Sequence, residues 1–213
     1  EFRRVLFRSG LTQILNQTIG LDSYSHVWWP STSSCIFNGE EQINGIKGQR
    51  FYFFIKDGQD IERAAKNLNE RLWAAGYGQY EISKSGSLLE KGLFDTAVWQ
   101  PSRIDFAAGA KCEAPLLQNR GEPQIYEGWE ADAIDTAQFF SSLTQEQALA
   151  AELIKKLAKE KKVTQADIIR KQWKLTRSVE LKTRSPIMAQ EHIDTIIEQA
   201  VERRQLMEIG RAH

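Results

Sequence analysis

The spacing of apolar residues predicts both helices and strands over the first part of the chain. Apolar residues within positions 11–19 recur at intervals of three and four, the period of an amphipathic helix, and Gly20 is suited to end that helix. Residues 27–30 and 49–56 are short apolar and aromatic runs next to turn residues, so each run predicts a strand.

The middle of the chain is predicted to contain one more helix and two more strands. Helical spacing over residues 60–75 predicts a second helix, with Asp60 as its N-cap and Gly76 just after its end. A brief strand is expected at residues 80–82, and another at residues 103–106.

From Thr144 onward the pattern is helical. Thr144 and Gln147 have the spacing of a capping box, which predicts a helix start. A second helix is expected to begin at Thr164, and a third at Ser185 and Pro186. The fold class predicted from these elements is α+β: a mostly antiparallel sheet with helices on one face, followed by a helical appendage.

The two ends of the chain are expected to be foreign to the fold. Residues 1–9 and 208–213 read as translations of opposite strands of one common sequencing-library adapter, so we leave them out of the fold prediction. The remainder is predicted to comprise an incomplete α+β domain at residues 10–135 and a basic helical connector at residues 136–207. We expect the chain to be a fragment of a longer protein.

Composition agrees with a globular protein and excludes several kinds of chemistry. The chain has 41% hydrophobic and 26% charged residues and no net charge. It shows no apolar run of membrane-spanning length and no signal peptide, so we expect a cytoplasmic protein. Cys35 and Cys112 are far apart and lack a CxxC partner, which argues against a zinc site. Only His26 and His192 lie outside the tail, so histidine-based metal or triad chemistry is not expected.

Residues 83–109 contain two candidate functional residues within one short stretch. Asp95 follows an apolar pair and could reach a metal ion from the end of a strand, or it could cap the next turn. Lys84 lies in a Ser-Gly loop and could bind a phosphate group, but the loop lacks the P-loop spacing, and a solvated lysine is the alternative.

A run of four hydroxyl residues at positions 31–34 is a further candidate. Hydroxyl and backbone N–H groups in such a loop can bind phosphate, which makes Ser33 and Ser34 candidates, although most such loops are solvated turns.

The helical part is strongly basic. Residues 151–185 contain eleven lysine and arginine residues against four acidic ones. A basic helix can hold the nucleic-acid backbone electrostatically, although a run of charge is more often a solvated helix face. The candidate DNA-binding residues are Lys155, Lys159, Lys162, Arg170, Lys171 and Lys174.

An ordered set of motifs resembles a known family. STSS, then GxR before an aromatic strand, then SxSGxLL, then FDxxVWQPxRIDFxxGA is similar to the primase-polymerase domains of mobile-element replication proteins, in the archaeo-eukaryotic primase superfamily. The resemblance covers roughly residues 11–126, and the motif around Asp95 is its most specific part.

The resemblance implies roles for individual residues. Asp95 matches the third acidic residue of the superfamily and would bind Mg²⁺ or Mn²⁺ as a catalytic residue. Arg50 stands where the family's GxH motif has histidine, and Arg50 and Lys84 would contact a nucleoside triphosphate. Arg103 is a weaker candidate for the nucleotide or template. The family's first acidic pair has no match, and one aspartate cannot hold two metal ions.

The resemblance implies that the intact protein performs metal-dependent nucleotidyl transfer, making primers or strands on the DNA of a mobile element. Its partners would be DNA, with single-stranded template expected, and a helicase domain downstream; no membrane is expected. The fragment by itself should be inactive. The alternatives are a non-catalytic DNA-binding or helicase-recruiting domain of the same family, which Arg50 favours, and a plain protein-interaction domain.

Overall fold

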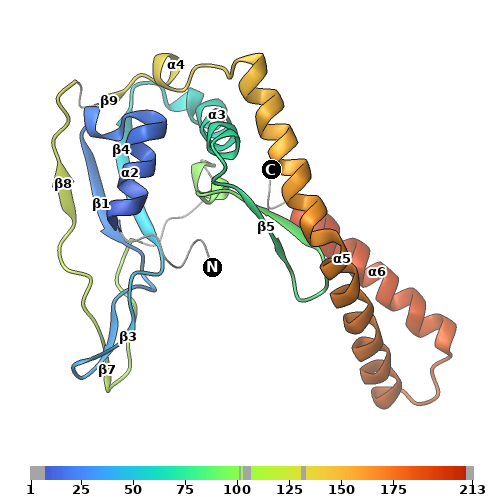
Figure 1. Ribbon diagram of the computed structural model, residues 1–213. Coiled ribbons are helices and arrows are strands. Elements are labelled where there is room, and N and C mark those ends of the chain that lie inside the picture. Colours follow the sequence, from blue (N-terminus) through green and yellow to red (C-terminus); the bar gives the residue numbers. More distant parts are fainter. Residues whose placement is uncertain (1–7, 101, 103–106, 131–132, 210–213) are drawn as a thin grey trace. The chain divides into compact units, whose positions relative to one another are not determined.

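The computed structural model describes residues 8–100, 102, 107–130 and 133–209, and it is α+β as predicted (Figure 1). The described chain divides into two compact units, which are treated separately below. The first contains Glu1–Leu68 and Val98–Ser142, and the second contains Asn69–Ala97 and Leu143–His213, both without the residues outside the described ranges.

The first unit is built on a four-stranded sheet in the order β8-β1-β4-β9. The central strands β1 (His26–Pro30) and β4 (Gln49–Ile55) are antiparallel, and β8 (Gln124–Tyr126) pairs antiparallel with β1. Only the short strand β9 (Ala133–Ile134) runs parallel to its neighbour in this sheet. The predicted antiparallel character is therefore confirmed.

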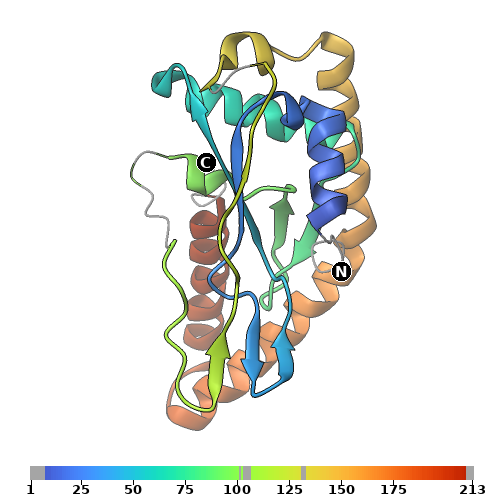
Figure 2. The same cartoon turned by 90° about the vertical axis from the view of Figure 1, so that its left-hand side faces the viewer.

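A smaller sheet extends the same unit. It has the order β3-β2-β7, from β2 (Ile36–Asn38), β3 (Glu41–Asn44) and β7 (Leu116–Gln118), all antiparallel. Figure 2 shows it at the opposite end of the unit from the short helix α4 (Thr136–Phe139).

The first helix, α2 (Arg8–Ile19), supplies much of the core of this unit. Its apolar residues Leu11, Ile14, Leu15 and Ile19 are all buried, as their helical spacing predicts. Gly20 follows with a φ of 58°, a left-handed conformation that ends the helix at the predicted residue.

Helix α3 (Ile61–Ala74) follows β4 after a short turn and a single 3₁₀ helix, and it ends before Gly76, whose φ is 82°. The prediction that Gly76 lies just after the end of this helix is therefore confirmed. The predicted N-cap is wrong: Asp57 caps the 3₁₀ helix η2 (Gly58–Asp60) by accepting from the Gln59 N–H, while the Asp60 carboxylate accepts from other side chains.

The second unit consists of a hairpin and two long helices. The hairpin joins β5 (Gln79–Ile82) to β6 (Leu88–Lys91), and the helices are α5 (Gln145–Arg184) and α6 (Gln190–Ile209). The capping box predicted at Thr144 and Gln147 is present, with both reciprocal hydrogen bonds.

Two predicted helix boundaries are wrong. Thr164 lies in the middle of α5, because Gln145–Arg184 contains no glycine or proline that would interrupt a helix. Pro186 lies in a turn closed by a hydrogen bond from the Met188 N–H to the Ser185 carbonyl, so α6 begins only at Gln190. The strand expected at residues 103–106 lies outside the described residues.

The hairpin turn packs closely on α5 at Gly86. A Cβ atom at Gly86 would lie 2.6 Å from the Ala166 carbonyl oxygen and 2.6 Å from the Arg170 backbone nitrogen. The φ of Gly86 is 80°, so both the conformation and the close approach require glycine.

We expect Gly86→Ala to destabilise the second unit more than Gly76→Ala does. Both glycines have positive φ, which costs a residue with a Cβ about 1–2 kcal/mol. Only Gly86 also meets backbone, whereas nothing lies within 4 Å at Gly76, so its variant should lose about 1–3 kcal/mol more. Urea unfolding followed by far-UV circular dichroism measures the difference. Equal losses in the two variants would contradict this packing.

Candidate functional site

The loop of four hydroxyl residues at positions 31–34 is hydrogen-bonded to the backbone just before β4. The Ser34 hydroxyl accepts hydrogen bonds from the N–H groups of Lys47 and Gly48 at 3.0 and 3.3 Å and donates to the Gly48 carbonyl at 3.2 Å. Ser34 is completely buried, so its hydroxyl holds the loop against the start of β4. Ser33 is exposed, with its Oγ 3.2 Å from that of Ser31, so of the two predicted residues only Ser33 is accessible to a ligand.

The other predicted nucleotide contacts are divided between the units. Arg50 lies on β4 of the first unit, half-buried and paired in register with Trp29. Lys84 and Asp95 both lie in the second unit and are exposed. Arg103 lies outside the described residues.

Asp95 has the geometry of a turn cap. Its Oδ1 accepts a hydrogen bond from the Ala97 N–H at 3.1 Å, at the start of the 3₁₀ helix η3 (Thr96–Trp99). Within the described ranges, no group of three or more histidine, cysteine, aspartate or glutamate side chains is placed to hold a metal ion. The capping alternative is therefore confirmed, and a metal role for Asp95 stays a prediction.

Hydrogen bonds of serine hydroxyl groups stabilise the hairpin turn that contains Lys84. The Ser83 hydroxyl accepts from the Ser87 N–H at 2.9 Å and lies 3.1 Å from the Ser85 hydroxyl, while Ser85 and Ser87 are buried. From α5, the Arg170 guanidinium donates to the Gly86 carbonyl at 2.9 Å. These contacts fix the turn on the helix and leave Lys84 exposed beside it.

Lys155 holds the base of the hairpin to α5. Its ammonium group lies 2.6 Å from the Glu70 carboxylate and 3.2 Å from that of Glu90. Burial works against the charged amine, but the hydrogen bond to Glu70 and the charges of both glutamates outweigh it and raise the pKa of Lys155. The same arrangement affects Tyr80: burial, with the nearby charge of Glu90, raises the pKa of Tyr80 to about 12.

One side of α5 combines these anchoring residues with accessible lysines. Lys155, Lys159, Lys162, Ala166 and Arg170 recur at intervals of three and four, so they share the side of the helix that meets the hairpin. Lys155 and Arg170 are engaged in the contacts above, whereas Lys159 and Lys162 are exposed. We call Lys84, Lys159, Lys162 and Arg170 the basic face.

The remaining two predicted DNA-binding residues lie apart from the basic face. Lys174 pairs with Glu198 of α6 at 2.5 Å and so joins the two helices. Lys171 is exposed on a different side of α5. The structure therefore packs the turn that contains Lys84 on the side of α5 that also contains three of the six predicted residues, and Lys155 and Lys174 are engaged in internal contacts.

The first unit contains an open cleft that was not anticipated from the sequence. It has a volume of about 540 Å³ and lies between the chain after β4, with the start of α3, and the region of α4. Its charged lining residues are Lys56, Asp57, Asp60, Arg63 and Asp135.

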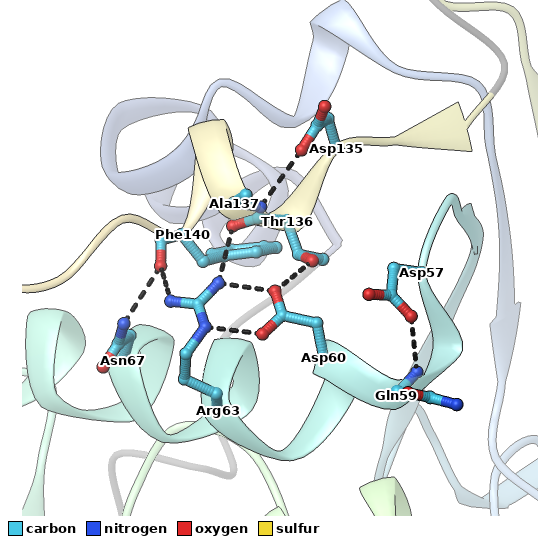
Figure 3. A network of polar contacts seen from close by, with 9 residues as sticks. All are labelled: Asp57, Gln59, Asp60, Arg63, Asn67, Asp135, Thr136, Ala137 and Phe140. Carbon is cyan, nitrogen blue, oxygen red and sulfur yellow. Dashed lines mark hydrogen bonds and ion pairs between the residues drawn. The ribbon is translucent and has the colours of Figure 1, made fainter.

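The floor of this cleft is a network centred on Arg63 (Figure 3). Its guanidinium forms two hydrogen bonds of 2.5 Å to the Asp60 carboxylate and also donates to the carbonyls of Phe140 and Thr136. The Thr136 hydroxyl donates to Asp60 at 2.5 Å, and the Asn67 amide donates to the Phe140 carbonyl at 3.0 Å. The hydrogen bonds from Arg63 and Thr136 lower the pKa of Asp60 to about 2.

Two other carboxylates of the cleft also accept hydrogen bonds from backbone N–H groups. Asp57 accepts from the Gln59 N–H at 2.9 Å, and Asp135 accepts from the Ala137 N–H at 3.1 Å. Lys56 lies 3.8 Å from Asp135 and is largely exposed. The network therefore ties the start of α3 to α4, and its contacts from Asp60 to Thr136 and from Arg63 to Phe140 join residues more than 70 positions apart in the sequence.

Comparisons with protein-family models, with curated proteins and with solved structures found no match for this chain. Among the described residues, no helix combines the length and the apolarity needed to cross a bilayer.

We expect the contribution of Asp60 to stability to disappear in acid. Because its folded pKa is lowered, the carboxylate stabilises the fold fully above its unfolded value of 3.8, and that stabilisation is lost as pH falls through about 2. The difference in unfolding free energy between the wild type and Asp60→Asn should therefore shrink over this range in urea titrations.

A double-mutant cycle with Arg63→Met supplies the control. The coupling between positions 60 and 63 should be present at neutral pH and absent near pH 2, because the bidentate pair needs the carboxylate. A coupling that does not change with pH would contradict the assigned pair.

Proposed function

We propose that this chain is the DNA-binding part of a replication protein that resembles the primase-polymerases. The observation that carries the proposal is the packing of the Gly86 turn on α5. The turn, with the exposed Lys84, meets α5 at Ala166 and Arg170, and Lys162 and Lys159 lie about one and two turns before Ala166 on the same side of the helix. Residues that come from two distant parts of the sequence thereby contribute to one basic face.

The internal ion pairs make this face suited to a phosphate backbone. Lys155 bridges Glu70 and Glu90 at the base of the hairpin and offsets one of their two negative charges. Arg170 pairs with Asp167 at 3.2 Å and binds the Gly86 carbonyl, which keeps the turn in place. Lys159 and Lys162 remain exposed to a ligand, and attraction to phosphate needs no base-specific contact.

Nucleotidyl transfer is the activity that the resemblance implies for the intact protein. Asp95 would then be a ligand of Mg²⁺ or Mn²⁺, as the resemblance implies. The described residues do not supply the several carboxylates of a two-metal site, so no catalytic step is assigned to them. The DNA-binding role does not depend on that activity.

We expect the salt dependence of binding to single-stranded DNA to reveal the basic face. If Lys159 and Lys162 each neutralise a phosphate, the double variant K159Q/K162Q should bind more weakly. The slope of log affinity against log salt concentration should decrease in magnitude by about 1.4, because each phosphate contact on a single strand contributes about 0.7. Fluorescence anisotropy with a labelled oligonucleotide measures both quantities.

The matched control removes the same charge from other sides of α5. Lys156 and Lys161 are exposed and lie away from the line of Lys155, Lys159 and Lys162, so K156Q/K161Q should retain most of the affinity and slope. Equal losses in the two double variants, or negligible binding of the wild type at low salt, would contradict the proposal.

A separate experiment tests the predicted metal role of Asp95. Asparagine keeps the oxygen that accepts from the Ala97 N–H, so Asp95→Asn should change stability little, whereas Asp95→Ala should lose about 1 kcal/mol. If Asp95 is a metal ligand, Asp95→Asn should nevertheless weaken Mn²⁺ binding at least about tenfold, measured by water-proton relaxation. Unchanged Mn²⁺ binding would limit Asp95 to its role in the turn.

A further inference from the structure

Helix α5 leaves one apolar face open along most of its length. The residues of this open apolar face recur at helical spacing, and 47–68% of each is exposed. They are Leu149, Leu153, Leu157, Ile168, Leu175 and Val179. A single exposed leucine needs no explanation, but a row of six exposed apolar residues on one side of a helix, interrupted only at Glu160, Thr164 and Lys171, indicates an interaction surface.

The row follows an eleven-residue repeat. The positions step by four, four and three residues, so Leu149, position 160 and position 171 begin successive repeats. This period of about 3.67 residues per turn makes the row drift slowly around the helix, and helices paired along such a row wind with a right-handed supercoil. From Leu149 to Val179 the row is about 45 Å long, at 1.5 Å per residue.

Neighbouring elements of the second unit leave this face open. The hairpin packs on the side of α5 that contains Ala151 and Ala166, which are buried. Helix α6 is joined to α5 through Lys174–Glu198 and through the hydrogen bond from Gln190 to Ser178. Leu175 and Val179 are nevertheless 68% and 67% exposed.

We infer that the open apolar face packs against the same face of α5 in a second copy of this chain, with the two helices antiparallel and a two-fold axis at Thr164. In this arrangement, residues whose numbers are symmetric about 164 lie opposite one another. Leu149 then faces Val179 of the second copy, and Leu153 faces Leu175. The packing is isologous, which is the usual geometry of a protein homodimer.

The charges along the face select this orientation. Glu146, in the first turn of α5, is the symmetric counterpart of Lys182 in the last turn, so opposite charges meet at both ends of the antiparallel pair. Across the axis, Lys171 faces Leu157 of the second copy and Glu160 faces Ile168. Glu160 and Lys171 are only one turn from being opposite, so their long side chains can extend past these apolar partners and pair with each other. In a parallel pair each of these residues would face its own copy, and four like-charged contacts would result. The complementary charges therefore favour a second copy of this chain as the partner, with its α5 antiparallel.

Sedimentation velocity of the full chain over a range of concentrations tests the dimer. The wild type should show a monomer–dimer equilibrium. Leu153→Glu alone and Leu175→Lys alone should each weaken it by about a hundredfold or more, because each places two charges against apolar partners in the symmetric dimer. Far-UV circular dichroism checks that each variant keeps its helices.

Mixing the two variants provides the decisive measurement. In an antiparallel pair, L153E in one copy faces L175K in the other, and the second contact of that pair remains leucine against leucine. An equimolar mixture should therefore associate more tightly than either variant alone, by at least about tenfold. A parallel pair gives no such recovery. Its absence, or a wild type that is monomeric at every concentration, would overturn the proposal and assign the face to another partner.

Disulfide formation checks the orientation independently, in a chain carrying C35S and C112S. L153C should form a linked dimer when mixed with L175C and should not do so alone. Linkage of L153C with itself would indicate a parallel pair and would also overturn the proposal. Because this experiment uses no DNA, its outcome is separate from that of the proposed function.

Discussion

The second unit depends on the close approach of the Gly86 turn to the backbone of α5. No side chain fits between the two, and the Arg170 guanidinium closes the contact by donating to the Gly86 carbonyl. At the other end of the hairpin, Lys155 binds Glu70 and Glu90 together. A two-stranded hairpin is only marginally stable by itself, so these contacts with a long helix are what keep its turn, and Lys84, in a defined place.

Local signals in the sequence predict local features of this fold well. Gly20 and Gly76 end their helices, and Thr144 with Gln147 begins α5, because each signal involves residues within one helical turn. Thr164 resembles an equally good helix start, yet the helix runs through it. A capping residue favours a start only where the preceding segment lacks helical stability, and no glycine or proline supplies that interruption in α5.

The sites were harder to predict because distant residues decide which polar groups are available. Asp60 looked like an N-cap, but its carboxylate is held by Thr136, 76 residues later in the chain. Ser34 looked like a phosphate contact, but the backbone of Lys47 and Gly48 already uses its hydroxyl. Lys155 and Lys159 are indistinguishable as members of a basic run, and only the positions of Glu70 and Glu90 separate an internal anchor from an exposed lysine. Composition gives the charge of a helix, whereas the fold decides where that charge can act.

The two faces proposed for α5 have a joint consequence for DNA binding. The basic face lies on the side that meets the hairpin, and the open apolar face lies on nearly the opposite side of the same helix. An antiparallel dimer joined through the apolar faces therefore directs its two basic faces away from each other. A short oligonucleotide can occupy only one of them, so dimerisation leaves its affinity unchanged. A strand long enough to reach around the pair of helices can occupy both, and the second contact is then made at a high effective concentration. Tighter binding of long strands than of short ones thus follows from the geometry of one helix, without any further contact to the bases.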